Sequence, residues 1–294
     1  MRISTQSIVN RTMNHLQSRL ASFEQAENRL ATGKNFTRSS EDVAGMNTSL
    51  ALRSERRALE QANRNGDDGT TRINLADSKL QQMLTSLRRA RDLTIRASST
   101  LQATERNAIS EEMASLREEL VELANSDYLG QGLFSGHAAA DAVSFSFGAW
   151  VYNGDTGAVN RRISETDDVQ VNLTGNEIFG FDDGEVVFDV LDQIIADVNA
   201  GDPAVVATGL DAIDRATDRI GNGLARLGAV GLRIETTLAR NLQIDETLQT
   251  QISSIEDVDL AEAVMDITTQ EVALQATLGA VGRAIQPTLM NYLR

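Results

Sequence analysis

The chain has 294 residues, a formal net charge of −15, no cysteine and only 2 prolines. The excess of carboxylates repels phosphate, so we expect no nucleic-acid partner and no binding to an anionic membrane surface. The lack of cysteine excludes disulfides, thiolate nucleophiles and cysteine metal sites, and the scarcity of proline permits very long helices.

Motifs for catalysis, cofactors or metal ions are absent from the sequence. The two histidines, His15 and His137, are far apart, and no phosphate-binding loop, nucleophile elbow or calcium loop is present. The sequence NGDTG at 153–157 offers oxygen atoms to calcium, but a hairpin turn is favoured because the full ligand spacing is missing. The arginines at 88, 89, 91 and 96 have helical spacing and are interpreted as surface or subunit contacts. We therefore expect a protein that is not an enzyme and has no catalytic, cofactor-binding or metal site.

No stretch of the sequence is apolar enough for a targeting or membrane segment. The first residues lack the apolar core of about 7–15 residues that a cleaved signal peptide contains. No run approaches the ~18 apolar residues of a membrane span. We expect a chain without a membrane span that is exported, if at all, without a cleaved signal.

The first part of the chain, 1–42, carries a heptad repeat. Its apolar residues recur at alternating spacings of four and three, at Val9, Met13, Leu16, Leu20 and Phe23. A stripe this narrow needs a partner helix, so coiled-coil pairing is favoured over packing on an ordinary core. We interpret 1–42 as the N-terminal half of a terminal coiled-coil domain.

The next part, 43–136, is predicted to form the outgoing helices of a rod. One heptad phase predicts a helix over about 43–99, through Leu52, Leu59, Ile73, Leu80 and Leu87. This helix is expected to start at the capping sequence SSED at 39–42, and Thr104 is expected to cap a shorter helix after it.

A β-rich insert is predicted at 137–183, where most aromatic residues gather. The sequences VSFSF at 143–147 and VQVNL at 169–173 alternate as half-buried strands do, and Asn153-Gly154 and Thr174-Gly175 are turn signals. Trp150 and Tyr152 offer rings on which a sugar stacks, but packing in the core is favoured. We expect the helical rod to fold even if a short linker replaces this insert.

The chain after the insert is again helical. The part at 184–256 is predicted to form the returning helices, one over about 187–199 and a longer one that starts at Asp202-Pro203. The part at 257–294 is interpreted as the C-terminal half of the terminal coiled coil. Its heptad positions are Leu260, Val264, Ile267, Leu274, Leu278, Val281 and Ile285.

These parts together predict a mainly α fold. We expect an elongated rod of long antiparallel helices, made of a terminal coiled coil and a helical bundle, with the small β-rich insert at the far end. The two terminal stripes are predicted to form an assembly seam, whose members are Val9, Met13, Leu16, Leu20, Phe23, Leu260, Val264, Ile267, Leu274, Leu278, Val281 and Ile285.

Several segments resemble the flagellin superfamily, and within it the hook–filament junction proteins. The N-terminal resemblance is carried by RLATGK at 29–34, SEDVAG at 40–45, QANRNGDDG at 61–69 and LRRARDL at 87–93. The C-terminal resemblance is carried by DVDLAEA at 257–263, LQA at 274–276 and PTLMNYL at 287–293. The start MRIST, LFSG at 133–136, VYNGD at 151–155 and VQVNLTGNEIFG at 169–180 are more similar to junction proteins than to filament flagellins.

The resemblance implies a structural, extracellular role in the bacterial flagellum. Such proteins are exported unfolded through the flagellar secretion apparatus with a chaperone, and they then assemble with copies of themselves. Their neighbours are the adjoining hook-associated protein and the first flagellin subunits. Two alternatives stay open: a filament flagellin, and a flagellin-like surface adhesin that binds glycan through the β insert.

Overall fold

The computed structural model describes residues 2–99, 102–138 and 141–290, with side chains described for Ser7 and from residue 10 to residue 282 within these ranges. Two compact units divide the chain. The first contains 1–57 and 244–294, and the second contains 58–243. The mainly α class, with long helices and small β hairpins, is confirmed. The expected domain boundaries at 42 and 256 lie near helix ends, whereas the two units divide inside long helices.

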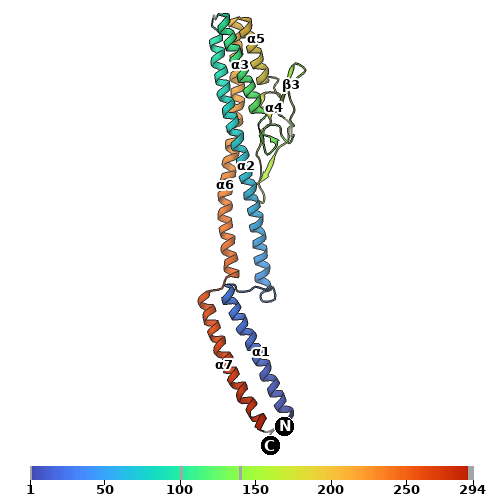
Figure 1. The fold of residues 1–294 in the computed structure, drawn as a ribbon, viewed down its shortest axis with the longest axis vertical. Helices are drawn as coiled ribbons and strands as arrows, with labels where there is room; N and C mark the ends of the chain where they lie inside the picture. The colour runs from blue at the N-terminus through green and yellow to red at the C-terminus, as the bar shows by residue number, and fades with distance from the viewer. Residues whose placement is uncertain (1, 100–101, 139–140, 291–294) are drawn as a thin grey trace. The chain divides into compact units, whose positions relative to one another are not determined.

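The first unit is built from four helical segments. Helix α1 (Arg2–Thr32) and helix α7 (Leu260–Met290) lie antiparallel and contact each other (Figure 1). The beginning of α2 (Val43–Ala97) and the end of α6 (Pro203–Glu256) complete the unit. Gly33 ends α1 with a φ of 67°, a conformation that glycine adopts without strain. Asp42 begins α2, because its Oδ1 accepts a hydrogen bond of 2.9 Å from the amide of Gly45.

The second unit holds the rest of α2 and α6, together with α3 (Ala103–Ala124) and α5 (Val187–Ala200). The predicted heptad phase of α2 is confirmed, since Ile73, Leu80 and Leu87 are buried in one continuous core. The predicted start at Asp202-Pro203 is also confirmed by a bond of 3.0 Å from the Ala204 amide to Asp202. The expected cap at Thr104 is wrong. Helix α3 starts after Gln102, whose amide donates to the Glu105 carboxylate at 3.1 Å.

Three separate antiparallel hairpins connect α3 to α5. They are β1 (Asp127–Tyr128) with β2 (Gln131–Gly132), β3 (Val143–Ser146) with β4 (Ala149–Tyr152), and β5 (Asn160–Arg162) with β6 (Asp168–Gln170). The short helix α4 (Gly175–Phe179) follows them. The first hairpin therefore precedes the expected insert at 137–183.

The two predicted turns are wrong. The β3–β4 turn lies at Phe147-Gly148, because Phe145 pairs with Trp150 and Val143 with Tyr152. The side chain of Asn153 instead donates to Ser144 Oγ at 2.9 Å, beyond the end of β4. Thr174 lies at the N-terminal end of α4 instead of in a hairpin.

The core of the insert is continuous with that of the helices. Phe134 and Phe179 stack edge to face with ring centroids 5.6 Å apart, and Phe179 also contacts Phe188 of α5. A Cβ added at Gly69 of α2 would lie 3.0 Å from Val171. Removing 137–183 would expose these buried faces, so we no longer expect a short linker to replace the insert without loss of stability.

Candidate assembly surface

The predicted seam residues lie on two neighbouring faces of the α1–α7 pair. One set faces the partner helix: Leu16 and Phe23 of α1, with Ile267 and Leu274 of α7, are half-buried, and Val281 is buried. This set spaces its members by seven residues, as a coiled-coil seam requires.

The other set is exposed to solvent. Its exposed fractions are 43% for Met13, 42% for Leu20, 60% for Leu260, 47% for Val264 and 52% for Leu278. The Val9 and Ile285 side chains lie outside the described ones.

The most buried described positions of the α1–α7 pair are small residues. Ala26 is 3% exposed and Ala263 is 5% exposed, and neither was among the predicted seam residues. On α7 the sheltered positions follow spacings of four and three through Ala263, Ile267, Gln270, Leu274, Thr277 and Val281. Alanine is too small to stand out among large apolar residues, and neither Ala26 nor Ala263 lies in the predicted heptad phases.

The apolar surface of the terminal helices is thus wider than one partner helix covers. Met265 is 63% exposed and Val272 is 66% exposed, and both lie on α7 although neither belongs to the predicted seam. Fully burying one such side chain is worth about 1.5–3 kcal/mol relative to leaving it exposed. A surface with this many half-exposed apolar side chains has the composition of a helix interface.

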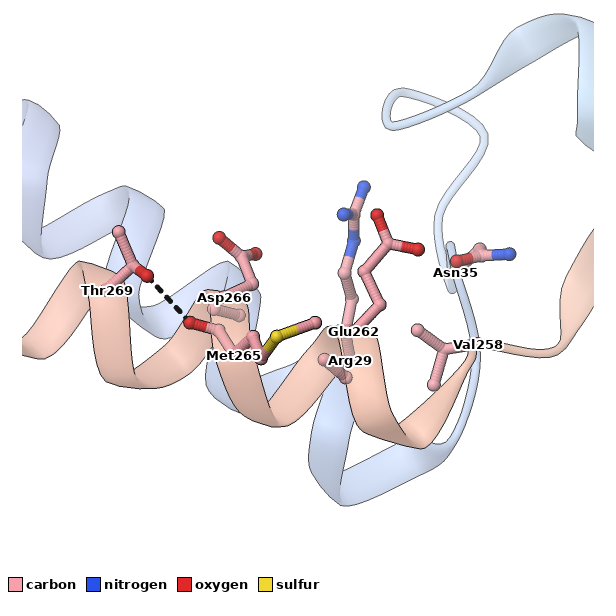
Figure 2. A pocket seen from close by; sticks show the side chains of 9 residues that line it. Arg29, Asn35, Val258, Glu262, Met265, Asp266 and Thr269 are labelled. Carbon is pink, nitrogen blue, oxygen red and sulfur yellow. Dashed lines mark hydrogen bonds between the residues drawn. The ribbon is translucent and has the colours of Figure 1, made fainter.

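A hollow of about 310 Å³ lies between the C-terminal end of α1 and the N-terminal end of α7. Figure 2 shows Arg29 and Glu262 side by side, with Met265 reaching toward them and Val258 and Asn35 at one end. The Nε of Arg29 is buried and has no hydrogen-bond partner among the described residues. The hollow therefore has a mixed lining, in which Arg29, Asn35, Glu262, Asp266 and Thr269 are polar and Ala26, Val258, Ala263 and Met265 are apolar.

In the first unit, a polar network joins the connector that follows α1 to the connector that follows α6. The Glu256 side chain, at the end of α6, is 7% exposed. It accepts bonds from Arg53 Nε at 2.8 Å and Nη2 at 2.6 Å, from Lys34 Nζ at 3.2 Å, and from the Ser49 hydroxyl. The Arg53 guanidinium and the other two donors lower the pKa of Glu256 from 4.5 to about 2, against the opposing effect of burial.

Backbone bonds run through the same network. The Asn35 amide donates to the Glu256 carbonyl at 2.6 Å, and the Val258 amide donates to the Gly33 carbonyl at 3.0 Å. The Asn35 side chain donates to the Asp257 carbonyl at 2.8 Å, and Lys34 pairs with the Asp257 carboxylate at 2.6 Å. Segments at 33–35 and 256–258 are therefore held to each other although they are more than 200 residues apart in sequence.

The aromatic residues considered for sugar stacking are occupied by other contacts. Trp150 packs against Phe145 and Phe188 with centroids 5.1 and 5.2 Å apart, and the guanidinium of Arg117 lies 5.9 Å from the Trp150 ring. The Tyr152 hydroxyl is 2.8 Å from the Phe134 carbonyl. These contacts correspond to the core packing that the sequence favoured.

The sequence motifs that suggested ions or phosphate are explained by internal contacts. The Asp155 carboxylate accepts bonds of 2.8 Å from the amides of His137 and Gly157, so it closes a loop. Arg89 pairs with Glu112 and Arg91 with Asp214, each at 2.6 Å. Within the described residues, no group of three or more histidine, cysteine or acidic side chains is placed to hold a metal ion. Among the same residues, no helix has the length and hydropathy that a membrane span needs.

Comparisons with known proteins agree with this architecture. The bacterial flagellin N-terminal helical region matches residues 3–139, and the bacterial flagellin C-terminal helical region matches residues 210–293. The flagellin of Bacillus subtilis is 27% identical over 97% of this chain and 97% of its own length. Flagellar hook-associated protein 3 of Salmonella typhimurium is 25% identical over 94% of this chain and 95% of its own length.

Solved structures share the fold. A putative flagellar hook-associated protein from Vibrio parahaemolyticus has a TM-score of 0.69 at 21% identity and covers 74% of this chain and 100% of its own. FlgL of Bacillus cereus has a TM-score of 0.59 at 22% identity and covers 69% of this chain and 99% of its own. The chain belongs to the bacterial flagellin family and is a structural subunit of the flagellum.

Proposed function

We propose that this chain is a subunit of the hook–filament junction and works by helical self-assembly. The observation that carries the proposal is the double apolar stripe on α1 and α7, of which one half is covered by the partner helix and the other half is exposed. The exposed half, with Met13, Leu20, Leu260, Val264 and Leu278, is the part of the predicted seam that is available to neighbouring subunits.

The proposed neighbours follow from the resemblance to junction proteins. Copies of this chain form a ring, with a hook-associated protein on one side and flagellin subunits on the other. The chain reaches this extracellular place unfolded, through the flagellar export apparatus and with an export chaperone. The absence of cysteine suits this route, because no thiol is available for misoxidation during refolding outside the cell.

Two observations support the junction over other places in the flagellum. The segments at 133–136 and 169–180 are more similar to junction proteins, and the Salmonella typhimurium hook-associated protein 3 aligns with this chain over nearly its whole length. A filament flagellin is the second candidate, because the Bacillus subtilis flagellin aligns with it equally completely.

Deleting the gene tests the proposal. A strain without a junction protein should make hooks that lack filaments and should release flagellin into the medium. Expression of the intact chain from a plasmid should restore the filaments. Normal filaments in the deletion strain would contradict the junction role, and a strain that secretes no filament protein at all would favour the filament flagellin.

A further inference from the structure

The turn between β3 and β4 carries an unusual residue at its tip. Phe147 has a φ of 53° and Gly148 has a φ of 88°, so both residues are in the left-handed region. Two-residue turns of this kind favour asparagine, aspartate or glycine, because a bulky side chain crowds its own backbone there. The Phe147 side chain is also fully exposed, at 108%. Folding of the isolated chain thus gains nothing from phenylalanine at this position.

The hairpin holds this tip firmly on the helices. Strand β3 contacts α3, and strand β4 contacts α5. Phe145 and Phe188 pack on Trp150, and the Trp150 Nε1 donates to the Asp192 carboxylate at 2.8 Å. Because these contacts fix the hairpin before any partner arrives, an exposed side chain at its tip loses little freedom on binding.

A hollow of about 770 Å³ lies beside the hairpin, between α3 and α5. Phe145, which is 57% exposed, and Trp150 give it an apolar wall. Its charged lining consists of the carboxylates of Glu118, Asp189 and Asp192 and the guanidinium of Arg117, which already pairs with Asp192. The charge of the lining is therefore negative, and a complementary surface is apolar with arginine at its edge.

The chain carries such a surface on α2. Ile95 is 44% exposed and lies two helical turns from Arg88 and next to Arg96. The neighbouring Arg89 and Arg91 are paired inside the unit, whereas Arg88 and Arg96 form no ion pair within 4.0 Å in the part of the chain that the structure describes. Asp92 lies between them, so the stripe keeps a positive charge.

We propose that the β3–β4 hairpin of one copy docks on the α2 stripe of Arg88, Ile95 and Arg96 in a second copy. Phe147 packs against Ile95, and the Glu118 and Asp189 carboxylates face the two arginines. This inference rests on the proposed function, in which copies of the chain form a ring.

The two patches are placed for contact between copies. Within the second unit, the hairpin projects beyond α3 and α5 on the right of Figure 1, while the C-terminal part of α2 lies on the left. A contact between two different patches is head-to-tail, and it closes a ring when the rotation between neighbours allows it.

Disulfide trapping tests the contact, because the natural chain has no cysteine. A chain with both Phe147→Cys and Ile95→Cys is expressed in cells, and isolated hook–filament structures are treated with diamide. We expect covalent ladders of more than two copies. The matched control pairs Ile95→Cys with Leu129→Cys, which lies at the tip of the β1–β2 turn with a φ of 52° and 83% exposure, and it should give no ladder.

The outcomes separate this inference from the proposed function. Protein that is present at the junction but gives no ladder from the Phe147 pair overturns the docking proposal alone. Equal ladders from both pairs also overturn it. Protein that is absent from the hook–filament fraction contradicts the proposed function itself.

Charge reversal gives an independent test in the same trapping assay. Glu118→Arg or Arg88→Glu alone should lower the ladder yield by about fivefold, since each brings like charges together. The double variant should recover most of the yield because the pair is restored with reversed signs. A double variant as weak as the single ones would contradict a contact between Glu118 and Arg88.

Discussion

At the scale of single residues, Glu256 joins several described segments of the first unit through its side chain. Its carboxylate bonds to three side chains from two segments, at Lys34, Ser49 and Arg53. A buried charge is tolerated only when its partners are present, so each of these contacts is needed to keep the others favourable. The heptad pattern gives no sign of this network, because its members are polar, come from the connector after α1, from α2 and from the end of α6, and are brought together only by the fold.

Removing the charge of Glu256 should destabilise the first unit. We expect Glu256→Gln to lower the free energy of unfolding by about 2 kcal/mol, less than for a fully buried pair because Arg53 and Lys34 reach solvent. Urea unfolding followed by circular dichroism measures the change. Glu246→Gln, an exposed position on the same helix, is the matched control and should have an effect within about 0.5 kcal/mol. Equal effects of the two substitutions would show that the network contributes no stability.

The same carboxylate predicts a dependence on pH. Its pKa in the folded chain, about 2, is below the ordinary value of 4.5, so unfolding takes up a proton between these values. The stabilisation is complete above about pH 4.5 and is lost as the pH falls toward 2. The difference in unfolding free energy between the natural chain and Glu256→Gln should therefore be constant from pH 6 to about pH 5 and shrink from there to pH 2.5. A difference that stays constant over this range would contradict the assigned pKa.

At the scale of helices, heptad spacing and the scarcity of proline were enough to predict α2, α5 and α6. Each of these helices is long or strongly amphipathic, and Gly201 and Asp202-Pro203 mark the boundary between α5 and α6. The turn positions of the hairpins were harder to predict, because cross-strand packing decides which residues form the turn. Pairing Phe145 with Trp150 puts Phe147-Gly148 in the turn, although Asn153-Gly154 is the stronger local signal.

The two faces of the terminal helices should respond differently to a charge. Leu274→Asp places a carboxylate against α1 and should weaken the pairing of α1 with α7, whereas Leu278→Asp lies on the exposed face and should leave that pairing intact. Both should block filament attachment while secretion continues, because the exported chain is unfolded. Circular dichroism of purified protein and electron microscopy of cells distinguish the two effects. Normal filaments on Leu278→Asp cells would exclude the exposed face from the assembly seam, and Thr268→Asp, an exposed polar position on α7, serves as the control.

In the free subunit, backbone amides of the two units should be protected from hydrogen exchange to different degrees. Between α1 and α7 the best-buried apolar side chains are two alanines and Val281, whereas the second unit buries Leu80, Leu87 and Leu93 completely. We therefore expect amides over 263–281 to exchange about 100-fold faster than amides over 80–93 in dilute protein. Hydrogen exchange with mass spectrometry measures this ratio. Equal protection would mean that the terminal pair is stable without neighbouring subunits.

At the scale of the whole molecule, the two units differ in how much of their apolar surface they bury. The second unit has a core of large apolar side chains that spans its helices and hairpins, so it carries its own stability. The first unit leaves apolar surface on its terminal helices uncovered and joins the connectors after α1 and after α6 through the Glu256 network. Sequence patterns predicted the helices of both units, but which apolar face stays exposed depends on where the partner helix packs, which only the fold decides.

Immunogold labelling of isolated flagella tests the central claim most directly. An epitope tag placed at the exposed Gly184 loop, which is not part of the α1 or α7 sequence, marks the position of the chain in the assembled organelle. The junction role predicts gold confined to the boundary between hook and filament on every labelled flagellum. Gold distributed along the length of the filament would contradict it.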